Sequence, residues 1–312
     1  MSFREKFSKE YKGAFATNSV AANNSLVWKS MPLWIDFADD NLIFIPGVNG
    51  NMPFYGVNAF IYMIQRSIAL GYDYVIYFDE DAFLVPGSEK LLEELFLDFA
   101  NSGCVVAGSP DGGSFCHRNH NNLMVNTFFS MWNIKAIKES GQFTPNLEEF
   151  LKTDVSFGNF TKQISSIRLS DMESRSKKAI EFSKMKNSDL AKDFPDSEFP
   201  YCKIVKNVVN NPVEPHQVPY SYKHDNFEPY YVLLEFLVKF TDKPIYYFNC
   251  SDYADADDDK SKSGVTSAVY DKSGEILLML HTWFSRDYTR ENSVHKPRIL
   301  SVIDFVKNLN NA

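Results

Sequence analysis

The chain has 312 residues and a formal net charge of -8, from 32 basic and 40 acidic residues. Hydrophobic residues make up 44% of the sequence and aromatic residues 15%. Disorder is therefore excluded, because such a chain can bury enough apolar surface to offset the entropy lost on folding. A pI near 5.3 disfavours DNA, RNA and anionic membrane surfaces as partners, since proteins that bind them concentrate Lys and Arg on one face.

The sequence shows no feature of export or membrane anchoring. Its first twelve residues mix charged and aromatic side chains, unlike a secretory signal. No stretch approaches the roughly 18 consecutive apolar residues of a membrane span. The four cysteines are widely spaced and include no C-x-x-C pair, which favours reduced thiols over a disulfide framework or a zinc site. We therefore expect a cytoplasmic protein without a transmembrane segment.

Strands and helices alternate in the first part of the chain. Each expected strand is a short apolar run, and each expected helix places its apolar residues at helical spacing. The expected elements are a first strand at 42–45, a helix at 56–70, a strand at 72–78, a helix at 88–100 and a strand at 104–107. Repeated strand–helix–strand units with buried strands indicate a parallel sheet with helices on both faces.

The pattern is less regular beyond residue 108. The expected elements are a loop at 109–122, an apolar segment at 124–137, a helical excursion at 165–205, a helix at 228–240, a strand at 244–248 and a hairpin with strands at 268–270 and 275–280. There is no internal repeat or low-complexity tract. One mixed α/β domain over residues 1–312 is therefore the simplest organisation.

Asp79 and Asp81 directly follow the expected strand 72–78. Ligands of open α/β sheets bind beyond the carboxyl ends of the strands, and residues two apart in extended chain point to the same side. The two carboxylates could thus share one divalent ion, with water and phosphate oxygens as its other ligands. The alternative is that they cap the following turn. Two further D-x-D matches lie in the acidic run 252–260, where a solvated turn is favoured.

His281 follows the expected strand 275–280. An imidazole that joins two carboxylates would suit Mn²⁺ better than Ca²⁺, which favours an all-oxygen site. From spacing alone, however, a hydrogen-bonded structural histidine is the favoured interpretation. The basic residues Arg286, Lys296 and Arg298 lie close in sequence and could pair with phosphate, although exposed basic side chains often bind nothing specific.

Two of these segments resemble motifs of a known family. The segment Tyr74-Val-Ile-Tyr-Phe-Asp79-Glu-Asp81 resembles the D-x-D element of glycosyltransferases with the GT-A fold, whose aspartates bind a metal that holds the sugar-nucleotide diphosphate. His281, in His-Thr-Trp-Phe-Ser-Arg286, is similar to the late histidine that completes the metal site in many members. The order of elements matches over roughly residues 40–290, but only these short motifs are specific.

The resemblance implies a single glycosyltransferase-like domain with a GT-A-like, Rossmann-like, mainly parallel sheet flanked by helices. It implies a hexosyltransferase-type enzyme that uses Mn²⁺ or Mg²⁺ to move a sugar from a nucleotide-sugar donor to a glycan or other hydroxyl acceptor. The implied metal ligands are Asp79, Asp81 and His281. Arg286, together with the two aspartates, is the implied contact to the nucleotide-sugar donor. The loop 47–53 matches no assigned nucleotide-binding signature, which leaves the donor base open.

The base that would accept the acceptor proton has three candidates. Asp225 and Glu228 lie in a segment that resembles the acidic element supplying the base in inverting members. Capping of the expected helix 228–240 explains the same two acids equally well. Asp111, beside two glycines beyond the strand 104–107, is the third candidate, with an ordinary turn as its alternative. The stereochemical outcome stays open.

Four residues of the apolar segment 124–137 are further candidates, and two rival functions fit the same sequence. Asn126, Phe128, Phe129 and Trp132 could border a sugar site, although aromatic residues in an apolar segment usually belong to the core. A sugar-phosphate nucleotidyltransferase would use a similar sheet and metal, but its loop needs basic residues, which 47–50 lacks. A carbohydrate-binding protein that keeps the fold without its chemistry is the rival outside enzymes.

Overall fold

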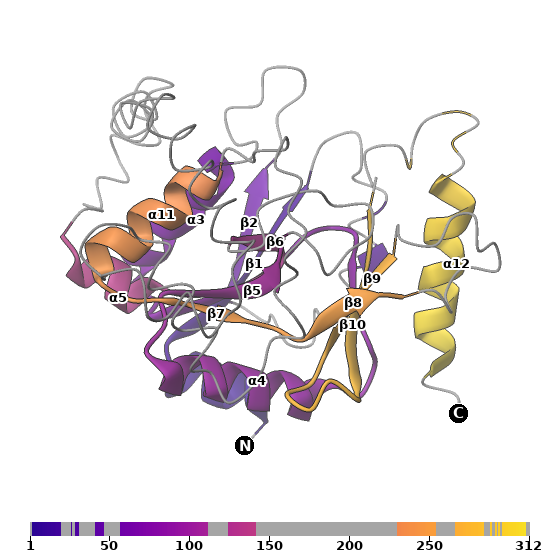
Figure 1. Cartoon of the computed structure of the whole chain (residues 1–312), viewed down its shortest axis with the longest axis horizontal. Helices are drawn as coiled ribbons and strands as arrows, with labels where there is room; N and C mark the ends of the chain where they lie inside the picture. Colours follow the sequence, from indigo (N-terminus) through magenta and orange to yellow (C-terminus); the bar gives the residue numbers. More distant parts are fainter. Residues whose placement is uncertain are drawn as a thin grey trace, which may run out of the picture.

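The computed structural model describes residues 2–19, 26, 29–30, 41–46, 57–111, 124–141, 230–253, 266–283, 288, 291, 293 and 295–309. They form a mixed α/β architecture with two sheets (Figure 1). The larger sheet has six strands in the order β2-β1-β3-β6-β5-β7. Its strands are β1 (Gly13–Ser19), β2 (Leu42–Pro46), β3 (Tyr74–Phe78), β5 (Val106–Pro110), β6 (Val125–Asn133) and β7 (Ile245–Tyr247).

Most strands of the six-stranded sheet run in one direction. β1 is parallel to β2 and β3, and β5 is parallel to β7. β6 lies between β3 and β5 and is antiparallel to both. β3 and β5 therefore end at the same edge of the sheet. This arrangement confirms the expected mixed, mainly parallel sheet.

Helices cover both faces of the six-stranded sheet (Figure 1). One face packs against α3 (Val57–Leu70), α5 (Ile134–Glu139) and α11 (Tyr230–Thr241). The other packs against α1 (Phe3–Lys9) and α4 (Glu89–Ser102). Alternate residues of β3 enter the two cores, as the two-residue period of a strand requires: Val75 and Tyr77 lie in one core, and Ile76 and Phe78 in the other.

The second sheet has four antiparallel strands in the order β4-β10-β9-β8. Its elements are β4 (Ala82–Leu84), β8 (Cys250–Asp252), β9 (Thr266–Tyr270) and β10 (Leu277–Thr282), and the C-terminal helix α12 (His295–Asn308) packs beside them. The expected late hairpin is present as β9 and β10. The chain passes from the large sheet to the small one between β3 and β4, which is where Asp79 and Asp81 lie.

The strand expected at 42–45 is present as β2 at 42–46, but it is not the first strand, because β1 precedes it and occupies an inner position in the sheet. β1 is rich in small residues and has no apolar run that would mark a strand. Its Gly13 lies against Phe7 so closely that an added Cβ would be 2.3 Å from the ring. β2 is also not buried on both faces: it forms the sheet edge, and Phe44 is 41% exposed.

Other expected elements are displaced or lie outside the described residues. The strand expected at 104–107 is β5 at 106–110, which takes the first two residues of the expected loop. The excursion at 165–205 falls outside the described part of the chain. Within that part, no helix has the length and apolar character needed to cross a membrane.

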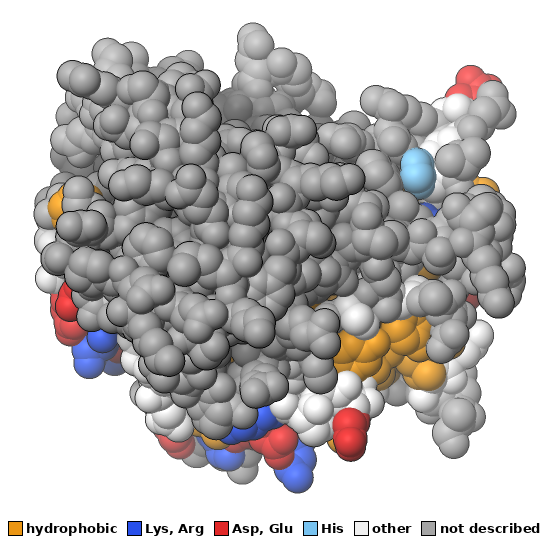
Figure 2. Space-filling model, viewed as in Figure 1, with side chains coloured by type: hydrophobic (Ala, Val, Ile, Leu, Met, Phe, Trp, Pro, Cys, Tyr) orange, Lys and Arg blue, Asp and Glu red, His pale blue; other side chains and the backbone are white. Residues whose placement is uncertain are grey.

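Along the lower edge in Figure 2, where Figure 1 draws α4, acidic and basic side chains alternate.

Candidate metal centre

Strand pairing brings Asp79, Asp81 and His281 together. The two aspartates lie in the turn between β3 and β4, where the Ala82 N–H donates to the Asp79 carbonyl at 3.1 Å. β4 pairs with β10 so that Ala82 lies opposite His281. The Thr282 N–H also donates to the Asp81 carbonyl at 3.0 Å. Two segments that are 200 residues apart in sequence thus meet at the carboxyl end of β3.

The three side chains are close enough to share one ion. A carboxylate oxygen of each aspartate and a ring nitrogen of His281 all lie within 4.8 Å of one another. One of these contacts joins His281 Nε2 to Asp81 Oδ1 at 3.1 Å. A divalent ion with bonds of about 2.0–2.6 Å separates opposite ligands by about 4–5 Å. The cluster could therefore hold a single divalent ion.

The electrostatics of the cluster favour a cation. Burial, and then the negative charge of Asp81, raise the pKa of Asp79 from 3.8 to about 6. His281 and the hydrogen bond from Tyr77 oppose that rise in pKa. Asp81 itself is only 4% exposed. Two carboxylates held together with little solvent repel each other, and a divalent ion between them would remove that repulsion.

Tyr77 orients Asp79 from within the core. Its hydroxyl donates to Asp79 Oδ1 at 2.6 Å. Burial, followed by the charge of Asp79, raises the pKa of Tyr77 well above its usual value, so the phenol stays protonated and keeps donating. The sequence pattern alone did not single out Tyr77. The signal was present, because Tyr77 is two residues before Asp79 and alternation puts both on one side of the strand.

The imidazole of His281 is held between two aromatic rings. The Phe128 ring stacks on it with centroids 4.2 Å apart and planes 4° apart. The Trp283 ring meets it edge-on, with centroids 4.5 Å apart and an interplanar angle of 80°. His281 Nδ1 is buried without a hydrogen-bond partner. The nitrogen that faces Asp81 is Nε2, and an imidazole nitrogen beside two carboxylates makes a donor set that fits Mn²⁺ or Mg²⁺, with the imidazole favouring Mn²⁺.

Asp111 is a further buried acid at the same edge of the sheet. It follows β5, as Asp79 follows β3, and its side chain is 0% exposed. Asp111 Oδ1 accepts a hydrogen bond from Asn126 Nδ2 at 2.6 Å, and Oδ2 accepts one from the Tyr230 hydroxyl at 2.8 Å. The carboxylate thus links β5, β6 and α11, which an ordinary exposed turn would not do.

The remaining candidates divide into three groups. Asp225, Glu228 and Arg286 lie outside the described residues. Phe129 and Trp132 are fully buried and stack on other core rings, so the core interpretation holds for both. Arg298 is buried and donates to the Thr266 hydroxyl and the Trp283 carbonyl. It therefore stabilises the protein around the small sheet and is not an exposed phosphate contact.

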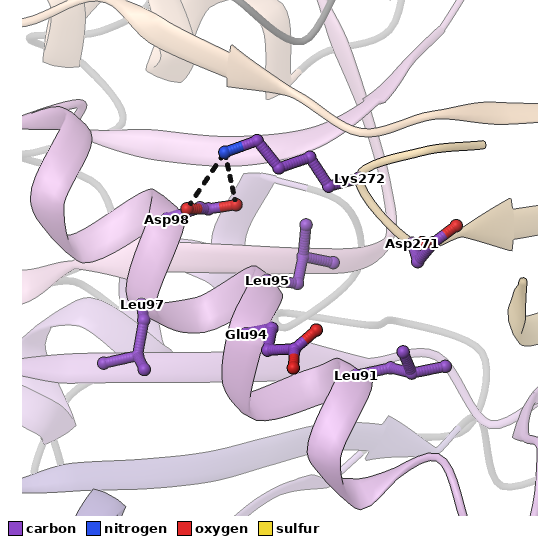
Figure 3. A pocket seen from close by; sticks show the side chains of 7 residues that line it. All are labelled: Leu91, Glu94, Leu95, Leu97, Asp98, Asp271 and Lys272. Carbon is purple, nitrogen blue, oxygen red and sulfur yellow. Dashed lines mark hydrogen bonds and ion pairs between the residues drawn. The ribbon is translucent and has the colours of Figure 1, made fainter. Parts of the chain in front are cut away.

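A cavity elsewhere in the protein is separate from the cluster. It has a volume of about 270 Å³ and lies between α4 and the turn that joins β9 to β10 (Figure 3). Leu91, Leu95 and Leu97 supply its apolar wall, and Lys272 pairs with Asp98 at 3.2 Å across it. None of the residues that line this cavity belongs to the metal cluster.

Comparison with known proteins finds distant structural similarity. No family model matches the chain. No curated protein matches it either. Among solved structures, the chain is similar to a glycosyltransferase involved in the glycosylation of the major capsid of PBCV-1, with a TM-score of 0.32 and 10% sequence identity. The similarity covers 41% of this chain and 62% of that one, so the match spans less than two thirds of the solved protein.

Proposed function

We propose that this protein is a metal-dependent glycosyltransferase that moves a sugar from a nucleotide-diphosphate donor to a glycan or other hydroxyl acceptor. The observation that carries the proposal is the convergence of Asp79, Asp81 and His281 at the carboxyl end of β3. Open α/β sheets bind ligands at that position. The resemblance of the same residues to the D-x-D element and late histidine of GT-A glycosyltransferases gives the site its proposed chemistry.

In this proposal Asp79, Asp81 and His281 hold Mn²⁺ or Mg²⁺. The ion, when bound, neutralises charge on the diphosphate that leaves the sugar. The protein fixes the ligands beforehand: Tyr77 donates to Asp79, and the Phe128 ring stacks on His281. Pre-oriented ligands reduce the reorganisation needed in the reaction. Arg286 is proposed as an additional contact to the donor phosphates.

The acceptor hydroxyl must lose a proton to a base if transfer inverts the sugar configuration. We propose Asp225 or Glu228 for that role ahead of Asp111. Asp111 already accepts hydrogen bonds from Asn126 and Tyr230, and donors to a carboxylate stabilise its charged form and weaken it as a base.

Two measurements test the proposed function. Nucleotide sugars are screened by thermal shift with and without Mn²⁺, and a shift that requires both identifies donor and metal together. Donor hydrolysis and transfer are then measured for Asp79→Asn and Asp81→Asn, with Asp304→Asn on the exposed side of α12 as the matched control. We expect both site variants to be inactive and the control to match the wild type.

Four outcomes would contradict the proposal. Undiminished transfer in EDTA, or full activity of both site variants, would remove the metal from the mechanism. Pyrophosphate release from a nucleoside triphosphate and a sugar phosphate would instead identify a nucleotidyltransferase. Glycan binding that Asp79→Asn leaves unchanged, without metal-dependent nucleotide binding, would identify a non-catalytic carbohydrate-binding protein.

A further inference from the structure

A large bulge interrupts the pairing of β6 with β5. Gly108 pairs with Ser130, but the next residue, Ser109, pairs with Asn126. Three residues of β6, from Thr127 to Phe129, therefore lie opposite a single step of β5. On its other side β6 keeps regular pairing with β3 up to Phe129. Bulges redirect side chains and are frequent next to active sites.

The side chain of Asn126 fixes the start of this bulge. Its Oδ1 accepts the Phe128 N–H at 3.0 Å, and its Nδ2 donates to Asp111 Oδ1 at 2.6 Å. Asn126 is 5% exposed and Asp111 is 0% exposed. In this dry setting the Asn126–Asp111 bond is electrostatically stronger than the same bond would be in water. Asp111 thus anchors an amide that in turn holds the backbone of Phe128.

Phe128 contacts two of the three residues in the metal cluster. Its carbonyl accepts the Asp79 N–H at 2.7 Å, and its ring stacks on His281. A continuous series of contacts therefore runs from Asp111 through Asn126 and Phe128 to Asp79 and His281. A displacement of the bulge would move the backbone of one proposed ligand and release the ring of another.

We propose that Asn126 and Asp111 are positioning residues, which set the geometry of the metal centre through the bulge Thr127–Phe129. This inference rests on the proposed function, because it takes Asp79 and His281 as metal ligands. It assigns to Asp111 a role other than proton transfer. The groups that orient metal ligands typically change metal affinity about 10–100-fold when they are removed.

The test compares two asparagines of the same strand. Asn126→Ala removes one donor and one acceptor beside the bulge, and Asn133→Ala removes the same two functions at the other end of β6, where Asn133 bonds to Cys104 and Ala136. Electron paramagnetic resonance of Mn²⁺ gives the metal dissociation constant of each folded variant. We expect at least about tenfold weaker binding for Asn126→Ala and no comparable loss for Asn133→Ala.

A second measurement, made on the protein without metal, tests the same effect independently of the Mn²⁺ dissociation constants. The stacked Phe128 ring shifts the C–H proton resonances of His281 upfield, and we expect Asn126→Ala to reduce that shift while Asn133→Ala preserves it. If Asn126→Ala does not fold, Asn126→Asp replaces it, since this variant keeps the acceptor for Phe128 but loses the donor to Asp111. The same weakening of Mn²⁺ binding is expected, because two carboxylates then face each other.

Asp111 is tested by the contrast between Asp111→Asn and Asp111→Ala. The asparagine keeps an acceptor oxygen for Asn126, so we expect it to bind Mn²⁺ more tightly than the alanine, which should lose both Mn²⁺ affinity and transfer. Loss of transfer by Asp111→Asn with Mn²⁺ affinity intact would make Asp111 a catalytic base and overturn its positioning role.

If the wild type binds Mn²⁺ and Asn126→Ala or its Asp replacement binds equally well, the inference alone fails. If the wild type binds no Mn²⁺, the proposed function fails with it.

Discussion

The phenyl ring of Phe128 lies almost parallel to the imidazole of His281, with 4.2 Å between ring centroids and 4° between planes. Phe128 belongs to β6 of the large sheet, and His281 belongs to β10 of the small one. The contact therefore ties the two sheets together at the metal cluster. Because stacked rings hold each other in one orientation, β6 shares control of a side chain that β10 supplies.

Phe128→Leu should disturb the metal cluster, whereas Phe129→Leu should not. Both residues are fully buried, so each change should lower the free energy of unfolding by about 1–3 kcal/mol. The Phe129 ring stacks on Phe78 and Phe248, outside the cluster. Urea unfolding measures the stability loss, and the His281 resonances report on the ring. Equal effects of the two variants on His281 would contradict this assignment.

The pKa of Asp79 should respond in opposite directions to changes at its two neighbours. In the metal-free protein we expect a pKa of about 6, measured from the carboxyl carbon resonance. Tyr77→Phe removes a donor that stabilises the carboxylate, so the pKa should rise. Asp81→Asn removes a nearby negative charge, so the pKa should fall. An unchanged pKa of Asp79 in both variants would show that burial alone sets the value.

The raised pKa of Asp79 should also make the metal-free protein less stable as the pH rises. Between the unfolded value of 3.8 and the folded value of about 6, the folded state binds more protons than the unfolded state. The contribution of Asp79 to stability is therefore fully present below pH 3.8, falls through this window and is constant above it. Urea midpoints at pH 4 and pH 7 check this, and Asp79→Asn should gain stability relative to wild type as pH rises. If the difference in urea midpoint between Asp79→Asn and the wild type were the same at both pH values, the prediction would be contradicted.

The sequence was sufficient to place the acids of the cluster but not the groups that hold them. Asp79 and Asp81 were predicted from a single local fact, their position after a buried strand. That His281 lies beside them depends on the pairing of β4 with β10, which no local pattern encodes. Phe128 was noted only as an aromatic residue, because its contact with His281 requires a bulge, and a bulge is a register shift between strands.

The missed strand β1 shows a second limit. Hydrophobic periodicity detects strands by their large apolar residues, and β1 is mostly small or polar, with Phe15 as its one large apolar side chain. It is buried because β2 and β3 flank it on both sides and because α1 covers it with Phe7. Its strand character therefore comes from its neighbours, which propensity rules do not include.

Gly108 should tolerate no side chain, because β6 lies directly against it at the two residues that precede the bulge. An added Cβ would lie 2.9 Å from the Asn126 carbonyl oxygen and 2.9 Å from Val125 Cβ. Gly108→Ala should therefore cost about 1–3 kcal/mol through overpacking and displace the bulge. Gly71→Ala is the control, since Gly71 has a φ of 79° and no atom within 4 Å of an added Cβ, so only backbone strain arises there. Urea unfolding and Mn²⁺ affinity are measured for both, and weaker Mn²⁺ binding is expected for Gly108→Ala alone. Intact affinity in that variant would show that the bulge adapts.

Arg298→Met should loosen the packing of α12 against the small sheet. The buried guanidinium donates to Thr266 Oγ1 at 3.1 Å and to the Trp283 carbonyl. Removing it leaves buried acceptors without those donors, which costs about 1–3 kcal/mol. Trp283 also rests edge-on against His281, so the variant should broaden the His281 resonances as well as lower the urea midpoint. Lys296→Met, an exposed change on the same helix, should stay within about 0.5 kcal/mol of the wild type. If Arg298→Met lowers the urea midpoint but leaves the His281 resonances unchanged, then α12 stabilises the small sheet without orienting His281, and that orientation depends on Phe128.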